Sequence, residues 1–296
     1  MLLNTLFHDM PLNERGRDFV VGDIHGHAAL LDHLLTVVTF DPSADRLIAL
    51  GDLIDRGPDG RKLLERVRDE PWFYSLRGNH EAMLMSARYG AFNFEIWEDN
   101  GGGWGRDLRP EEHEHLAAIA ACLPLAMALP LHDGRRIGLI HAELHPRHVW
   151  QDLEDLRIVL NSETLDGADS WLESAALWGR TRIHAAAMAH AGAKGGLTSL
   201  ERETLQRALE PVAGIDQIIS GHTILRRRQP LSASNLLFID TGAFQPTGRL
   251  TLVEPLTRRY WQTRYIRTGA VGVIRRSGSW LPAPLCLKAV IPAKPQ

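Results

Sequence analysis

Cysteine is almost absent from this chain, which has only Cys122 and Cys286 among its 296 residues. Two cysteines so far apart do not make a disulfide framework, and they fit a reducing compartment. Apolar residues nowhere run uninterrupted for about 18 positions, so we expect no membrane-spanning helix. The first eight residues have neither the positive region nor the apolar stretch of a signal peptide. We therefore expect a soluble, cytoplasmic protein.

An excess of positive charge is also lacking. The net charge of −3 gives no electrostatic basis for binding nucleic acid or an anionic membrane. The basic triplet Arg226-Arg227-Arg228 has no interleaved aromatic residues and is typical of a solvated loop. Neither glycine-rich pattern of a nucleotide-binding loop occurs. With 44% hydrophobic and 23% charged residues, the chain is long enough for one large α/β domain.

Three short polar strings stand out in the first third of the chain. Each follows an apolar run that predicts a β-strand, and each offers ligand atoms where the chain turns. The strings are Gly22-Asp23-Ile24-His25-Gly26, Gly51-Asp52-Leu53-Ile54-Asp55-Arg56-Gly57 and Arg77-Gly78-Asn79-His80-Glu81. Together they supply the carboxylate, amide and imidazole ligands that a two-metal hydrolytic site needs.

Strand-like runs alternate with helical patterns along the chain. Later apolar runs end at His141, at Ser220-Gly221-His222 and at Asp240-Thr241-Gly242. This alternation predicts βαβ units and a partly parallel sheet, whose ligands bind beyond the carboxyl ends of the strands. We therefore expect all six strand ends to meet in one pocket. The expected helices are residues 28–38, 60–68, 81–89, 110–122, 152–172 and 199–209.

Several of these residues suit metal binding. Asp23 and His25 are two apart at a strand end and can both reach one ion, although Asp23 could equally cap the following helix. Asp52 has two carboxylate oxygens and is our candidate for a ligand that bridges two ions. The remaining candidate ligands are Asn79, His141 and His222.

A second pair, His80 and Asp55, has a different chemistry. Hydrolysis of a phosphate ester needs a proton for the departing oxygen, and an imidazole with a carboxylate partner holds one near neutral pH. Arg56 and Arg77 adjoin the proposed ligands and suit phosphoryl oxygens, which guanidinium groups bind in a bidentate manner. An arginine beside an aspartate is otherwise an ordinary surface ion pair.

The three strings resemble the signature blocks of the metallophosphoesterase superfamily. More narrowly, they resemble the phosphoprotein phosphatases, a family of serine/threonine phosphatases, in their bacterial and phage branch. The resemblance spans about residues 17–254. The later blocks that carry it are His141-Ala142-Glu143, Ser220-Gly221-His222-Thr223 and Asp240-Thr241-Gly242-Ala243, with Asn100-Gly101-Gly102 near Trp104 as a feature of the branch.

The resemblance implies an α/β protein with a calcineurin-like fold. This fold is a four-layer α/β/β/α sandwich with two mixed β-sheets. We expect a single domain over residues 1–296, with its core at about 17–254. A helical insertion is expected at about 145–214 and a β-rich C-terminal extension at about 255–291.

The same resemblance implies a metal-dependent phosphomonoesterase. Two divalent ions are expected. The resemblance favours Mn²⁺ as their identity, and the ligand types also suit Fe or Zn. A hydroxide that bridges them would attack phosphorus, and His80, paired with Asp55, would be the general acid. The first ion would be held by Asp23, His25 and Asp52, and the second by Asp52, Asn79, His141 and His222. Phosphate would be bound by Arg56, Arg77 and Arg180, with Arg182 close enough to leave the third assignment open.

A rival activity on the same metal core is the hydrolysis of a dinucleoside polyphosphate such as diadenosine tetraphosphate. Relatives with that activity often lack the acid before Arg-Gly-Pro and the arginine before Gly-Asn-His, which are Asp55 and Arg77 in this chain. We therefore expect a serine/threonine phosphatase, with phosphotyrosine left open. Its partner would be a phosphorylated protein or a small phosphoester, and neither nucleic acid nor a membrane is expected.

Overall fold

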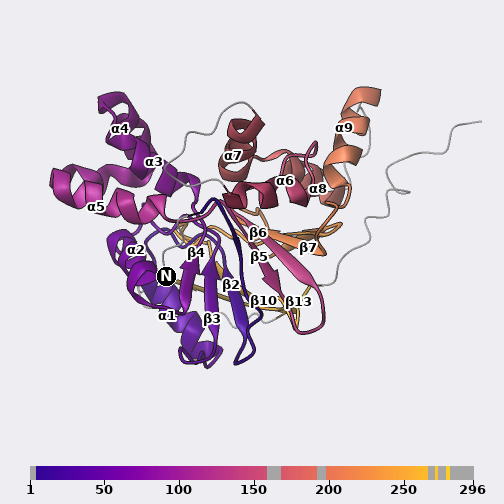
Figure 1. Ribbon diagram of the computed structural model, residues 1–296, viewed down its shortest axis with the longest axis horizontal. Coiled ribbons are helices and arrows are strands. Elements are labelled where there is room, and N and C mark those ends of the chain that lie inside the picture. Colours follow the sequence, from indigo (N-terminus) through magenta and orange to yellow (C-terminus); the bar gives the residue numbers. More distant parts are fainter. Residues whose placement is uncertain (1–4, 159–167, 192–197, 266–270, 273–277, 281–296) are drawn as a thin grey trace, which may run out of the picture.

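The computed structural model describes residues 5–158, 168–191, 198–265, 271–272 and 278–280 (Figure 1). Its strands are β1 (Phe7–Asp9), β2 (Asp18–Val21), β3 (Arg46–Ala49), β4 (Phe73–Ser75), β5 (Ala126–Pro130), β6 (Arg136–Ile140), β7 (Gln217–Ser220), β8 (Leu231–Ala233), β9 (Leu236–Phe238), β10 (Leu250–Glu254), β11 (Arg259–Tyr265), β12 (Val271–Gly272) and β13 (Gly278–Ser279). Its α-helices are α1 (Ala28–Val37), α2 (Gly60–Asp69), α3 (Asn79–Ala87), α4 (Ala91–Trp97), α5 (Pro110–Ala121), α6 (Trp150–Glu154), α7 (Ala168–Trp178), α8 (Thr181–Ala191) and α9 (Ser199–Leu209). A π-helical turn (Glu98–Gly102) and two 3₁₀ turns (Gly103–Asp107 and Asp155–Ile158) complete the helical segments of these residues.

The strands of the described residues form two mixed sheets. One has six strands in the order β1-β5-β6-β7-β9-β8, and the other has seven, β12-β11-β10-β2-β3-β4 with β13 beside β11. In the seven-stranded sheet β2, β3 and β4 are parallel, and β10 is antiparallel to β2. In the six-stranded sheet β6, β7 and β9 are parallel, and β5 is antiparallel to β6. The parallel strands are those that the polar motifs follow, so their carboxyl ends gather the motifs.

Three clusters of buried apolar side chains separate four layers. One lies under helices α1 to α5, one lies under α6 to α9, and the third lies between the sheets. Strand β3 shows how alternation builds two of them, since Leu47 and Ala49 join the cluster under α1 to α5 and Ile48 joins the cluster between the sheets. Figure 1 shows the two helix groups apart, with α1–α5 on the left of the view and α6–α9 at its upper middle and right. The predicted α/β/β/α sandwich is confirmed.

Most of the expected elements are present, but one expected helix is not, and several elements appear that were not expected. Residues 152–172 do not form one helix, because α6 ends at Glu154 in a 3₁₀ turn and α7 begins at Ala168, with 159–167 outside the described residues. Strand β5 was not expected, because its sequence Ala-Met-Ala-Leu-Pro has no β-branched residue. Its place between β1 and β6 overrides that weak propensity. None of the described helices combines the length and the apolar character needed to cross a membrane.

Candidate metal centre

The turns that follow the strands hold several side chains in uncommon backbone conformations. His25, Asp52, Asp55, Arg56 and His222 have φ values of 47°, 50°, 70°, 68° and 65°. A left-handed conformation costs a non-glycine residue on the order of 1–3 kcal/mol, and such residues cluster at functional sites. All five were candidates from the sequence or neighbours of candidates in the same strings, and the structure places them at the strand ends.

The carboxylate of Glu81 ties two of these turns together. It accepts backbone N–H groups from Asp52 (2.9 Å), Leu53 (2.9 Å) and Gly78 (2.8 Å). The two turns lie so close together that a Cβ on Gly78 would be 2.2 Å from Oδ1 of Asp52. Burial, together with the nearby Asp52, raises the pKa of Glu81 to about 7. Glu81 belongs to the third string, but its place in that string gives no sign of this role.

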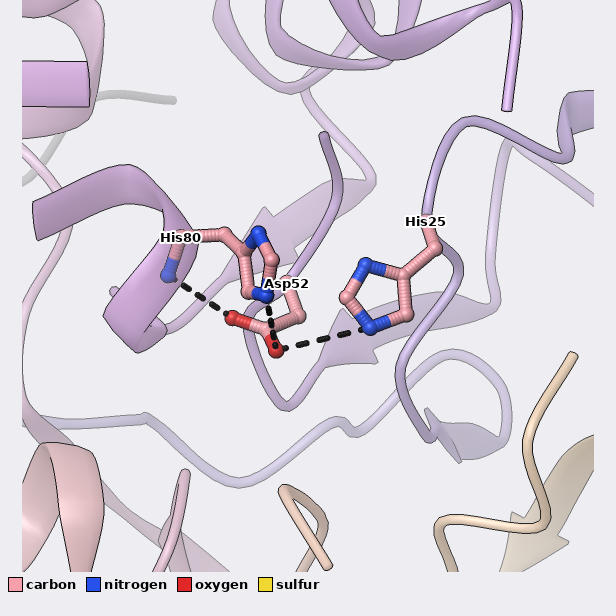
Figure 2. A group of neighbouring side chains, drawn as sticks. All are labelled: His25, Asp52 and His80. Carbon is pink, nitrogen blue, oxygen red and sulfur yellow. Dashed lines mark hydrogen bonds and ion pairs between the residues drawn. The ribbon is translucent and has the colours of Figure 1, made fainter. Parts of the chain in front are cut away.

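The first group of potential metal ligands is His25, Asp52 and His80 (Figure 2), whose ligand atoms lie within 4.8 Å of one another. Nε2 of His25 is 3.6 Å and Nε2 of His80 is 3.8 Å from Oδ2 of Asp52. The Nδ1–H of His25 donates to the Ile54 carbonyl (3.0 Å), which leaves Nε2 as the ligand atom. Figure 2 shows both imidazoles beside the same carboxylate.

The second group is Asp52, His141 and His222, again within 4.8 Å. Nε2 of His141 is 3.5 Å from Oδ1 of Asp52, so the two oxygens of Asp52 face different groups. The amide oxygen of Asn79 lies 3.0 Å from Nε2 of His141 and 3.0 Å from Nδ1 of His222. The Nδ1–H of His141 donates to the Leu50 carbonyl (2.8 Å). This arrangement fits the expectation that Asp52 bridges two ions.

The electrostatics of both groups suit divalent cations. Burial lowers the pKa of His25 and His141 and lowers that of His222 to about 3, so all three imidazoles are neutral near pH 7. Burial would raise the pKa of Asp52, but the surrounding imidazoles hold it below its usual value. Neutral imidazoles and an ionised carboxylate are the protonation states that a metal ion needs. The donor set therefore fits the implied ions.

His80 differs from the other three imidazoles. Its Nδ1–H donates to Oδ2 of Asp55 (2.6 Å), and both side chains are buried. Burial alone would lower the pKa of His80, but Asp52 and Asp55 outweigh it and raise the pKa above the usual value. The same cluster thus contains three imidazoles with a lowered pKa and one with a raised pKa.

Asp23 lies beside these groups without being a member of either. Both of its oxygens accept the backbone N–H of His222, at 3.1 and 3.0 Å. Burial and the neighbouring Asp240 raise the pKa of Asp23, and burial raises that of Asp240 to about 6. The role of Asp23 as a ligand stays a prediction. Asp240, which ends the last of the strand-like runs, is a further buried acid beside the site.

Two of the three predicted phosphate-binding arginines reach the metal ligands. Nη1 of Arg56 is in hydrogen-bond contact with Nε2 of His25, and its guanidinium lies 4.2 Å from the ring centroid of Phe244. Nε of Arg180 donates to Nε2 of His222 (3.1 Å). The guanidinium groups of Arg56 and Arg180 therefore lie where an anionic group would approach the metal ligands. Phe244 is a neighbour of the site that no sequence signal had indicated.

The third predicted arginine, Arg77, and the alternative to Arg180, Arg182, are buried in other contacts. Arg77 donates to the Ala121 carbonyl (2.7 Å) and its Nη1 is 3.9 Å from Glu173 on α7, so its role in phosphate binding stays a prediction. Arg182 is held by the Leu144 and Ala208 carbonyls. Arg182 therefore has a structural place, and the contact with His222 favours Arg180 for the third position.

Comparison with known proteins finds similarity to phosphoesterases. A family model described as calcineurin-like phosphoesterase matches residues 19–225. Serine/threonine-protein phosphatase 1 of Salmonella typhimurium is 34% identical over 242 residues, which cover 80% of this chain and 90% of that protein. Serine/threonine-protein phosphatase 2 of Escherichia coli is 31% identical over 239 residues, covering 80% and 91%. A symmetrical bis(5'-nucleosyl)-tetraphosphatase of Paracidovorax citrulli is 42% identical over 74 residues, covering 25% and 26%.

Solved structures share the fold at lower identity. A protein serine/threonine phosphatase from Saccharomyces cerevisiae superimposes with a TM-score of 0.53 at 18% identity, covering 96% of this chain and 86% of that chain. A putative diadenosine tetraphosphatase superimposes with a TM-score of 0.52 at 19% identity, covering 93% and 99%. These two likenesses support the two-sheet architecture of the chain.

Proposed function

This chain belongs to the calcineurin-like phosphoesterases, and on that premise we propose that it is a metal-dependent serine/threonine protein phosphatase. The observation that carries the proposal is the bridging position of Asp52, whose two oxygens face the two imidazole groups. The phosphatase relatives, which match 80% of the chain, support this class of substrate. Phosphotyrosine and small phosphoesters are further candidate substrates of the same site.

The ligands would be divided between two ions. Asp23, His25 and Asp52 would hold one, and the other would be held by Asp52, Asn79, His141 and His222. When bound, the two ions would lower the pKa of a water molecule and neutralise charge on the phosphoryl group. We propose Mn²⁺ for both positions, and Fe or Zn would suit the same nitrogen and oxygen ligands.

Arginine side chains of the protein would orient the substrate. Arg56 and Arg180 stand at the imidazoles of the two groups, where they can bind phosphoryl oxygens from two sides. Arg77 would be the third such residue and would have to exchange its contact with Glu173 for the substrate. These contacts would hold the phosphorus in line between the incoming and the leaving oxygen.

His80 would supply the proton for the leaving group. As the bond from phosphorus to the ester oxygen breaks, its electron pair passes to that oxygen, which takes the proton from Nε2 of His80. Asp55 holds the opposite nitrogen of the ring at 2.6 Å and stabilises the protonated form. The dyad is buried, which keeps bulk water from competing for the proton.

The remaining expectations extend the proposal to the protein's surroundings. We propose a cytoplasmic location, in keeping with the low cysteine content. The physiological partner would be a phosphorylated protein. The helical segment at about 145–214 carries Arg180 and Glu173, so we propose that it shapes the entrance for that partner.

Hydrolysis of a dinucleoside tetraphosphate is the second candidate function. It is favoured by the 42% identity to a tetraphosphatase, although that match covers only 25% of this chain. Competition between a phosphoserine peptide and diadenosine tetraphosphate at equal Mn²⁺ concentration distinguishes the two. We expect the peptide to have the higher kcat/KM, and the opposite order would reassign the enzyme.

Substitutions at the metal centre test the proposal directly. Asp52→Asn should abolish Mn²⁺-dependent phosphate release from an aryl phosphate, because Asp52 belongs to both groups. His80→Asn should lower kcat about 100- to 10,000-fold, the range that proton transfer contributes. Asp45→Asn is a matched control, since Asp45 is equally buried but pairs with Arg17 away from the site. Unchanged turnover in Asp52→Asn or His80→Asn would refute the assignment.

A further inference from the structure

Asp55 is held by more than its histidine. Its carboxylate is 0% exposed and accepts three N–H groups. His80 and the indole of Trp97 (2.9 Å) both donate to Oδ2, and the indole of Trp104 donates to Oδ1 (2.8 Å). A buried carboxylate is stable only when donors satisfy its oxygens, and here donors on both oxygens also fix its rotation.

The two indoles come from a single segment that covers Asp55. Trp97 ends α4, and Trp104 lies in the 3₁₀ turn that follows the π-helical turn. Gly102 and Gly105 make this compact path feasible, because a Cβ on either would lie 2.4 or 2.2 Å from the Trp97 ring. The segment also reaches the strand-end turn itself, since the backbone N–H of Arg56 donates to the Gly101 carbonyl (3.3 Å).

This segment contains the glycine-rich string beside Trp104 that the sequence singled out and that no step of the reaction uses. Packing explains part of it, because the Trp97 ring lies edge-on to Trp104 (5.4 Å between centroids) and stacks on His113 (5.7 Å). Packing alone does not require that two indole N–H groups from one segment meet on one carboxylate. Their convergence satisfies a buried carboxylate and also fixes the orientation of the group that holds His80.

We propose that Trp97 and Trp104 are positioning residues, whose N–H groups hold Asp55 so that Nε2 of His80 stays aimed at the departing oxygen. The inference rests on the proposed function, because it assumes that His80 protonates the leaving group. When either indole is removed, fewer donors fix the carboxylate, which can then turn further about its Cβ–Cγ bond and shift the ring of His80. Small misplacements of a reacting group can cost up to about 100-fold in rate.

The dependence of rate on the leaving group separates this role from simple packing. Dinitrophenolate departs without a proton, whereas phenolate and serine alkoxide need one as the phosphorus–oxygen bond breaks. Trp104→Phe keeps a ring but removes the N–H, and Trp104 is only half-buried, so the variant should fold. We expect kcat to fall about tenfold or more for phenyl phosphate, and less than about threefold for 2,4-dinitrophenyl phosphate.

Trp150→Phe is the matched control. Trp150 is also buried, but among the described residues its indole N–H meets no acceptor, and it packs on Gly138 in the cluster under α6 to α9. Its loss should lower both rates equally or not at all. Trp97→Phe should show the same selective loss as Trp104→Phe. Thermal melting and near-ultraviolet circular dichroism show whether each variant is folded, and if one is not, the other still tests the proposal.

His80→Asn, measured with the same two substrates, separates this inference from the function on which it rests. A selective loss in His80→Asn together with equal or no losses in both tryptophan variants would overturn the positioning role alone. A wild-type enzyme that hydrolyses neither substrate, or a His80→Asn variant without leaving-group selectivity, would overturn the proposed function and this inference with it. Selective losses in all three variants, with none in Trp150→Phe, support the proposal.

Discussion

The two sheets contribute to the metal centre in different ways. The turns after β2, β3 and β4 of the seven-stranded sheet carry the first part of the site, and Glu81 binds two of those turns to each other through backbone N–H groups. The six-stranded sheet contributes His141 and His222, which both make polar contacts to the other sheet, while His222 also accepts from Arg180. One half of the site is therefore tied together internally, and the other half is anchored across the interface between the sheets.

The anchoring contacts of the second half are specific. His141 donates to the Leu50 carbonyl at the end of β3, and the His222 ring lies against the amide oxygen of Asn79. The backbone N–H of His222 donates to Asp23. A ligand set built in this way forms only when the sheets pack, so the two halves should respond differently to substitution.

Removing one imidazole from each half should have the largest effect. His25→Ala and His141→Ala should each reduce the number of Mn²⁺ ions bound, measured by isothermal titration calorimetry, from two to one. Phosphate release should fall about 10- to 100-fold or more, since even the supporting partners of metal ligands have effects of that size. Asp52 contributes to both groups, so only Asp52→Asn should remove both ions.

His132→Ala serves as the control for these variants, because His132 also bonds a backbone carbonyl but lies between β5 and β6, outside the site. It should retain both ions. If His25→Ala and His141→Ala each lost both ions, the two groups would be one indivisible unit and the comparison between the sheets would fail.

Removing the Glu81 carboxylate, which joins two turns of the seven-stranded sheet, should have the next largest effect. This effect is on the free energy of unfolding. Glu81→Ala leaves the buried N–H groups of Asp52, Leu53 and Gly78 without their acceptor. Each such loss costs about 1–3 kcal/mol, so the free energy of unfolding in urea should fall by about 3 kcal/mol or more. Glu65→Ala, which breaks an exposed pair with Arg61, should cost less than about 1 kcal/mol. Equal losses would show that Glu81 does not hold the turns.

A small change in the core should sharpen the comparison further. Ile48 lies between the sheets, and Ile119 lies in the cluster under α1 to α5. Replacing either with valine should lower the free energy of unfolding by about 1 kcal/mol. Only Ile48→Val should also weaken the binding of one Mn²⁺ ion, because it loosens the interface that positions His141. Identical Mn²⁺ titrations for both variants would argue against that link.

Much of the fold could be predicted from the sequence because apolar runs and polar turns report directly on buried parallel strands. Strand β5 could not be predicted, because its own residues do not favour a strand and only its neighbours in the sheet select that conformation. The helix expected over 152–172 failed for a related reason, because a helical pattern does not show where packing ends a helix.

The structure brings several of the candidate ligands together, although the side chains that meet are not all those that the resemblance assigned to each ion. The resemblance implied that Asp23 would hold the first ion. The structure brings His25, Asp52 and His80 together and places the oxygens of Asp23 at the backbone N–H of His222, so the assignment of Asp23 stays a prediction. Local spacing does not determine which oxygen of Asp52 faces which imidazole. The choice between Arg180 and Arg182 likewise depended on where α8 begins and on which side chain reaches His222.

The sequence by itself determined the inventory of the site: strands followed by turns that carry aspartate, asparagine, histidine and arginine. These features follow from local periodicity and from the chemistry of single side chains, which need no neighbours to be recognised. The tertiary structure alone decided the protonation of four similar imidazoles. The pKa of His80 is raised because Asp52 and Asp55 lie against it, whereas burial lowers the pKa of His25, His141 and His222. Such differences arise from desolvation and from charges distant in sequence, which exist only once the two sheets have closed around Asp52.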